Sequence, residues 1–124
     1  MRLHESAENY LEAILILEQA RAEVRSIDVV NHLGFSKPSV SVAMKRLRED
    51  GYVEMDSRGY LALTAPGREI AETIYERHRL IAEILMGLGV EEQVAYADAC
   101  KIEHDISQES FEKMKAHYLA HRGQ

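Results

Sequence analysis

Three side chains that could bind a metal stand close together near residue 100. Cys100, Glu103 and His104 occupy positions i, i+3 and i+4, and on an α-helix this spacing places all three on one face. A thiolate, a carboxylate and an imidazole that converge on one point form a donor set for a divalent transition metal. The alternative is a buried cysteine beside a glutamate and a histidine on the surface, and this stretch alone leaves both interpretations open.

The composition is that of a globular protein without a membrane span. The chain has 124 residues, of which 46% are hydrophobic and 29% charged, which suits one domain or one small domain with an appended element. No apolar run approaches the roughly 20 residues that cross a bilayer, and the first residues lack an apolar signal core. A single cysteine excludes an intramolecular disulfide and fits a reducing compartment, so we expect a cytoplasmic protein.

The net charge of −6 argues against nucleic-acid binding at first sight. The charge is, however, unevenly distributed along the chain. Residues 25–68 carry seven Lys or Arg and five Asp or Glu, whereas the rest of the chain carries eight and 16. Within residues 36–48 there are four basic residues and no acidic one. An acidic body with a local basic stripe suits a DNA-binding protein whose other half holds cations.

Residues 7–50 carry the signals of three helices. Apolar residues at helical spacing predict them over 7–21, 27–33 and 37–50. Ser26 and Ser36 are predicted to cap the second and third helices, and Gly34 suits a left-handed residue at the end of the second. Two helices of this length joined by a tight turn form a helix-turn-helix.

Two short alternating runs follow, at 52–56 and 60–63. They flank a polar turn that contains Gly59 and therefore predict a β-hairpin. Earlier in the chain, Val24-Arg25 is expected to be a short extended piece at most. A helix-turn-helix followed by a hairpin is a winged helix. We therefore expect a DNA-binding domain over 1–64, with the hairpin as a small β wing.

The chain beyond the hairpin is predicted to be helical. Helices are expected over about 65–86, 91–105 and 108–121. Their apolar faces exceed what the preceding winged helix could cover, so self-association is expected even without metal. The expected fold class is mainly α: a winged helix-turn-helix followed by an α-helical dimerisation and metal-binding domain over 65–124.

The second helix of a helix-turn-helix enters the major groove with its N-terminal residues on the base edges. Hydroxyl groups there can donate or accept hydrogen bonds, so they can contact several bases. Basic groups contact phosphates, and the tip of the hairpin supplies the contact of the wing. These criteria select Ser36, Lys37, Pro38, Ser39, Ser41, Lys45, Arg46, Arg48 and Arg58. Pro38 either packs on a thymine methyl group or only starts the helix. A winged helix that binds protein instead of DNA is the structural alternative.

One half-site read by so few basic groups gives weak, salt-sensitive binding. Affinity then requires a homodimer that spans two half-sites of a palindromic operator, about one helical turn or more apart. The expected partners are double-stranded DNA and a second copy of the chain, with no membrane and no small organic substrate.

Four stretches of the chain form a joint pattern. They are Ala7-Glu8-Asn9-Tyr10-Leu11-Glu12-Ala13-Ile14, Leu63-Thr64-Ala65-Pro66-Gly67, Arg77-His78-Arg79-Leu80 and Asp98-Ala99-Cys100-Lys101-Ile102-Glu103-His104. Together with the winged helix, they resemble the diphtheria toxin repressor and manganese transport regulator family over nearly all of residues 6–110. The resemblance implies a dimeric, cytoplasmic repressor of metal-homeostasis genes that Fe²⁺ or Mn²⁺ activates.

The resemblance also implies a metal site built from three helices. Its ligands would be Glu12, His78, Cys100, Glu103 and His104, with Asn9 as a doubtful sixth. Asn9 stands where the best-known members have Met or Asp, and it offers only a neutral oxygen. The iron-type members have a second metal site, which is incomplete here because Ala82 and Tyr96 replace its carboxylate and one of its histidines.

The sequence leaves alternatives open for the identity of the metal and for the class of protein. Cys, His and carboxylate ligands bind Zn²⁺, Co²⁺ or Ni²⁺ in vitro at least as tightly as Fe²⁺, while the thiolate of Cys100 favours iron over manganese. The expected mechanism is that bound metal locks the DNA-binding half onto the dimer core. The rival is a metal-independent winged-helix regulator or protein-interaction module with vestigial ligands. An enzyme is not expected, because no nucleophile–base pair, Gly-rich phosphate loop or HExxH motif is evident.

Overall fold

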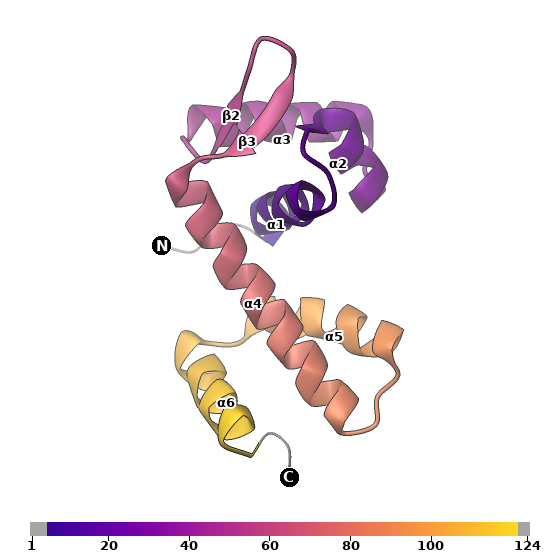
Figure 1. Ribbon diagram of the computed structural model, residues 1–124, viewed down its shortest axis with the longest axis vertical. Helices are drawn as coiled ribbons and strands as arrows, with labels where there is room; N and C mark the ends of the chain where they lie inside the picture. The colour runs from indigo at the N-terminus through magenta and orange to yellow at the C-terminus, as the bar shows by residue number, and fades with distance from the viewer. Residues whose placement is uncertain (1–4, 122–124) are drawn as a thin grey trace. The chain divides into compact units, whose positions relative to one another are not determined.

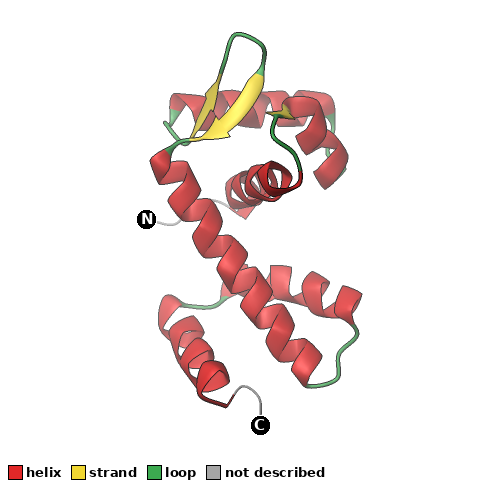
Figure 2. Ribbon diagram, viewed as in Figure 1, coloured by secondary structure: helices red, strands yellow, loops and turns green. Residues whose placement is uncertain are grey.

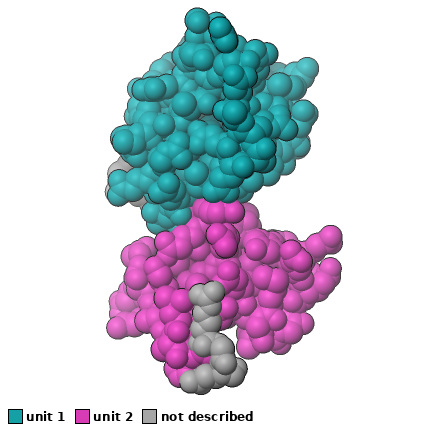
Figure 3. Space-filling model, in the orientation of Figure 1, with its two compact units in different colours: residues 1–73 teal, residues 74–124 magenta. Residues whose placement is uncertain are grey.

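The computed structural model describes residues 5–121, which fall into two compact units (Figures 1 and 3). The first unit extends to Thr73 and the second begins at Ile74. The elements are α1 Glu5–Ala20, β1 Val24–Arg25, α2 Ser26–Leu33, α3 Lys37–Glu49, β2 Val53–Met55, β3 Tyr60–Leu63, α4 Ala65–Gly87, α5 Glu92–Asp105 and α6 Gln108–His121. Helices predominate (Figure 2), which confirms the mainly α fold class.

The turn between α2 and α3 has the geometry that its sequence predicts. Gly34 ends α2 in the left-handed region, with φ 73°, where glycine carries no steric cost. The Ser36 hydroxyl caps α3, since its oxygen accepts a hydrogen bond from the Ser39 N–H at 3.2 Å. The buried stripe of α3 consists of Val40, Met44 and Leu47. The helix-turn-helix is thereby confirmed.

The predicted cap of α2 is wrong. Ser26 is already helical, and Arg25 is the N-cap residue. The Asp28 carboxylate reaches back and accepts a hydrogen bond from the Arg25 N–H at 2.9 Å. This carboxylate also pairs with Arg21 at 2.7 Å. An acid in the first turn therefore supplies the cap that the Ser26 hydroxyl was expected to provide.

The hairpin is part of a three-stranded antiparallel sheet with strand order β1-β3-β2. The short extended piece at Val24-Arg25 is the third strand, and it pairs with Leu61 and Tyr60 of β3. In the β2–β3 turn, the Asp56 carboxylate accepts from the Arg58 and Tyr60 N–H groups at 2.8 and 3.0 Å. A two-residue strand carries no periodicity, so the sequence could not show its pairing.

The start of α4 is fastened to the turn after α3. The Thr64 hydroxyl donates to the Gly51 carbonyl at 2.7 Å, and the Thr64 N–H donates to the Tyr52 carbonyl at 3.1 Å. Gly67 passes so close to this turn that a Cβ atom there would overlap the Tyr52 carbonyl group. The Thr-Ala-Pro-Gly stretch therefore sets the direction in which α4 leaves the hairpin.

The second unit is a small helical core. Its buried residues are Leu80, Ile81 and Ala82 from α4, Ala95 and Ala99 from α5, and Phe111 from α6. The small alanine side chains let the backbones of these helices approach closely. Arg77, which is 5% exposed, donates to the Ile106 carbonyl at 3.0 Å and lies over the Phe111 ring. It thereby joins α4 to the end of α5 and to α6.

The longest helix, α4, has 23 residues that belong partly to each unit. Charged side chains recur along it, among them Arg68, Glu69, Glu72 and Glu76. None of the helices within residues 5–121 is long and apolar enough to cross a membrane.

Candidate metal centre and DNA-reading helix

The three donors near residue 100 converge on one face of α5. A ligand atom of each of Cys100, Glu103 and His104 lies within 4.8 Å of the others. The fully buried Glu103 (0% exposed) continues the stripe of Ala95 and Ala99, and its Oε1 lies 3.4 Å from His104 Nε2. A buried carboxylate is costly unless a cation or strong hydrogen bonds stabilise it. This donor set fits a divalent transition metal.

His78 adds a donor from α4. One of its ring nitrogens and a Glu103 carboxylate oxygen lie within 4.8 Å of each other. His78 Nε2 lies 2.9 Å from the Tyr96 carbonyl oxygen, which can only accept, so Nε2 carries the proton. In a neutral imidazole with this tautomer Nδ1 has the lone pair, and a backbone carbonyl that orients a histidine in this way is typical of metal ligands.

The remaining predicted ligands come from the first unit. Asn9 and Glu12 lie three residues apart on α1, and the Glu12 side chain is 5% exposed. A metal site that contains them needs both units. Of the two residues expected to replace donors of a second site, Ala82 lies in the core of the second unit, and Tyr96 offers its backbone carbonyl to His78.

All nine predicted DNA contacts are exposed. Eight lie on α3 or at its N-cap, namely Ser36, Lys37, Pro38, Ser39, Ser41, Lys45, Arg46 and Arg48, and Arg58 lies in the turn between β2 and β3. Lys37, Ser41, Lys45 and Arg48 are spaced so that they share one side of the helix. Arg48 Nη1 also contacts the Met55 sulfur at 3.3 Å, which brings its charge next to the wing.

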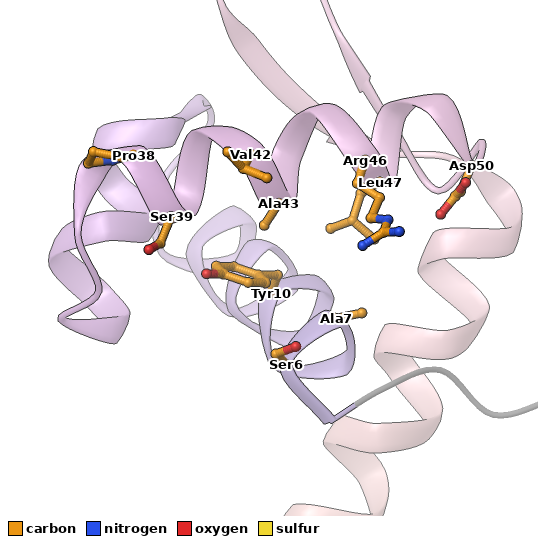
Figure 4. A pocket seen from close by; sticks show the side chains of 10 residues that line it. All are labelled: Ser6, Ala7, Tyr10, Pro38, Ser39, Val42, Ala43, Arg46, Leu47 and Asp50. Carbon is orange, nitrogen blue, oxygen red and sulfur yellow. The ribbon is translucent and has the colours of Figure 1, made fainter.

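An open cleft runs along the other side of α3, between this helix and α1 (Figure 4). It is lined by Ser6, Ala7 and Tyr10 of α1 and by Pro38, Ser39, Val42, Ala43, Arg46, Leu47 and Asp50. Burial raises the pKa of the Tyr10 phenol above its ordinary value. Val42 is absent from the predicted contacts although it is 68% exposed. Its signal in the sequence is an apolar residue outside the 40, 44, 47 stripe.

Two family descriptions together match nearly the whole chain. Residues 2–61 match "Iron dependent repressor, N-terminal DNA binding domain", and residues 64–121 match "Iron dependent repressor, metal binding and dimerisation domain". The chain belongs to the iron-dependent repressor family. The predicted family and class of function, a metal-dependent DNA-binding transcriptional repressor, are confirmed.

Individual relatives in this family agree in sequence and in fold. The transcriptional regulator MntR of Escherichia coli is 34% identical over 111 residues, which are 90% of this chain and 72% of that protein. The structure of T. acidophilum IdeR has a TM-score of 0.79 and 25% identity, covering 95% of this chain and 55% of that one. A manganese-dependent transcriptional repressor in complex with manganese has a TM-score of 0.80 and 26% identity, covering 89% and 51%. The chain thus spans about half the length of these two solved structures.

Proposed function

We propose that this protein is a cytoplasmic repressor of metal-homeostasis genes that binds operator DNA when Fe²⁺ or Mn²⁺ is bound. The domain over 1–64 would bind the DNA. The domain over 65–124 would form the dimer and bind the metal. The observation that carries the proposal is the buried Glu103 carboxylate beside Cys100, His104 and His78. Relatives named as transcriptional regulators support a binding protein and not an enzyme.

The residues that would hold the cation come from both domains. Cys100, Glu103, His104 and His78 provide a thiolate, a carboxylate and two imidazoles, and Glu12 adds a second carboxylate. Asn9 is the weakest donor, because an amide oxygen is neutral. When bound, a divalent cation supplies positive charge and a fixed arrangement of ligands. By ligand preference alone, Zn²⁺, Co²⁺ and Ni²⁺ would also bind in vitro.

The two carboxylates make the switch. Without a cation, Glu12 and Glu103 repel each other, so the two domains sample many arrangements. The two α3 helices of a dimer then have no fixed spacing. When both carboxylates share one cation, the domains are tied together and the dimer matches the two half-sites of a palindromic operator. A coupling free energy of about 1–3 kcal/mol would change DNA affinity roughly 5–150-fold, and DNA would tighten metal binding by the same factor.

The test is DNA selection with and without metal. The protein is mixed with a randomised duplex pool in Mn²⁺, in Fe²⁺ under anaerobic conditions, and in excess chelator, and the affinity of the selected duplex is measured in each. We expect inverted repeats to be enriched only with metal. Equal affinity in chelator, unchanged by Glu103→Gln or His104→Ala, would instead support the metal-independent regulator.

A further inference from the structure

Two histidines lie one helical turn apart near the end of α6. His117 and His121 stand at positions i and i+4, and both side chains are exposed. Their ring centroids are 4.2 Å apart, and the ring planes are inclined by 31°. The core of the second unit takes Phe111, Met114 and Tyr118 from this helix, and neither histidine belongs to it. Packing of the fold therefore does not account for the pair.

The backbone orients the ring of His121. Its Nδ1 lies 2.8 Å from the His117 carbonyl oxygen, which can only accept a hydrogen bond, so Nδ1 carries the proton. In a neutral imidazole with this tautomer, Nε2 has the lone pair. A backbone carbonyl that holds the other ring nitrogen in this way is typical of histidines that bind a metal through the free nitrogen.

The separation of the two rings suits one shared ion. Zinc–nitrogen bonds measure about 2.0–2.1 Å, so two nitrogens on one tetrahedral ion lie roughly 3.4 Å apart. Rings whose centroids are 4.2 Å apart can present two nitrogens at this separation after small side-chain rotations. Two histidines at i and i+4 on a helix are also the arrangement that supplies two ligands in helical zinc motifs.

The chemistry of the donors selects the metal. Imidazoles suit Ni²⁺, Cu²⁺ and Zn²⁺, whereas Mn²⁺ prefers oxygen ligands. Residues 113–121 carry two lysines and no acidic residue, so this end of α6 offers Mn²⁺ neither a carboxylate ligand nor an attractive charge. The pair differs in this respect from the donors around Glu103.

We infer that His117 and His121 form a second metal site, which takes Ni²⁺, Cu²⁺ or Zn²⁺ and not Mn²⁺. Both ligands belong to α6, so an ion held there does not join the second unit to the first. The site is therefore independent of the proposed metal switch, and water completes its coordination because both side chains are exposed.

Calorimetric titration of the whole chain with Ni²⁺ counts the sites. We expect His117→Ala to bind one Ni²⁺ ion fewer per chain than wild type. Two groups held together bind more tightly than either alone by roughly 10²–10⁴, so the loss of one imidazole should weaken this site about 100-fold or more. A parallel titration with Mn²⁺ should give the same stoichiometry and affinity for both proteins, which also shows that the variant is folded.

Two further variants separate the pair from adventitious binding to surface histidines. Ala116→His combined with His117→Ala keeps the number of histidines but places them five residues apart, on different sides of the helix, so it should lose the same ion. His32→Ala removes an exposed histidine of α2 and should keep that ion. If His117→Ala loses no Ni²⁺, or if the rearranged variant binds as many ions as wild type, the pair is not a site. Weaker Mn²⁺ binding in His117→Ala would contradict its independence from the switch.

Discussion

Glu103 is the residue on which metal binding should depend most. Its carboxylate is fully buried next to Cys100, His104 and His78, so Glu103→Gln removes the charge while keeping the shape. Metal affinity should fall by more than the roughly 10–100-fold that loss of a ligand's hydrogen-bond partner costs. Competition with a chromophoric chelator measures it. Glu92→Gln changes an exposed acid on the same helix and should leave the affinity unaltered; similar losses in both variants would refute a specific site.

Gly67 should tolerate a side chain least among the helical glycines described. Gly67→Ala forces a methyl group against the Tyr52 carbonyl, and such overpacking costs about 1–3 kcal/mol of unfolding free energy. At Gly87, by contrast, the space around an added Cβ is open. Gly87→Ala should therefore be neutral or stabilise by up to about 1 kcal/mol. Urea denaturation measures both variants, and equal stabilities would contradict the close approach of α4 to the turn after α3.

The donor positions and their neighbours were predictable from the sequence to different degrees. The spacing of Cys100, Glu103 and His104 on one helix predicted their convergence, because helical geometry is local. The burial of Glu103 was not predictable, since it depends on packing among α4, α5 and α6. The exposure of Val42 was not predictable either, because it also depends on packing. From the sequence alone, a valine on a helix is expected to be a core residue.

At the scale of elements, α3 should bind DNA mainly through charge. Lys45 is exposed and shares a side of the helix with Lys37 and Arg48. If Lys45 neutralises one phosphate, Lys45→Ala should reduce the slope of log affinity against log salt by about 0.9. The loss of affinity should be similar for all sequences, because phosphate contacts carry no base information. Lys113→Ala removes an exposed charge from α6 instead, and an equal effect of both variants would contradict this assignment.

The elements themselves were largely predictable, with two physical exceptions. Gly34 ends α2 and Ser36 caps α3 as predicted, because helix caps and left-handed glycines depend on a few adjacent residues. The α2 cap was mistaken because the helix begins one residue earlier than expected: Asp28, in its first turn, accepts from the Arg25 N–H and makes Arg25 the N-cap residue. Strand β1 escaped prediction as a paired strand because its partner, Tyr60-Leu61, lies far along the sequence.

At the scale of the molecule, the second unit should hold two copies together without metal. It matches a dimerisation domain and leaves Leu88, Val94 and Leu119 exposed by 77%, 47% and 47%. The match to a dimerisation domain is the reason to expect that a second copy covers such exposed apolar side chains. Sedimentation equilibrium in excess chelator should therefore give a dimer at micromolar concentration. A monomer that dimerises only after Mn²⁺ is added would show that metal builds the dimer as well as the DNA-competent state.

In the proposed switch, metal acts by joining Glu12 of the first unit to the donors of the second. The most direct measurement is the affinity for the selected duplex in saturating Mn²⁺ and in chelator, for wild type, Glu12→Gln and Glu23→Gln, the last being a change of an exposed acid. Wild type and Glu23→Gln should show the same metal enhancement, within the roughly 5–150-fold range of such couplings. Glu12→Gln should still bind Mn²⁺ but gain little DNA affinity from it. Undiminished enhancement in Glu12→Gln would contradict the claim.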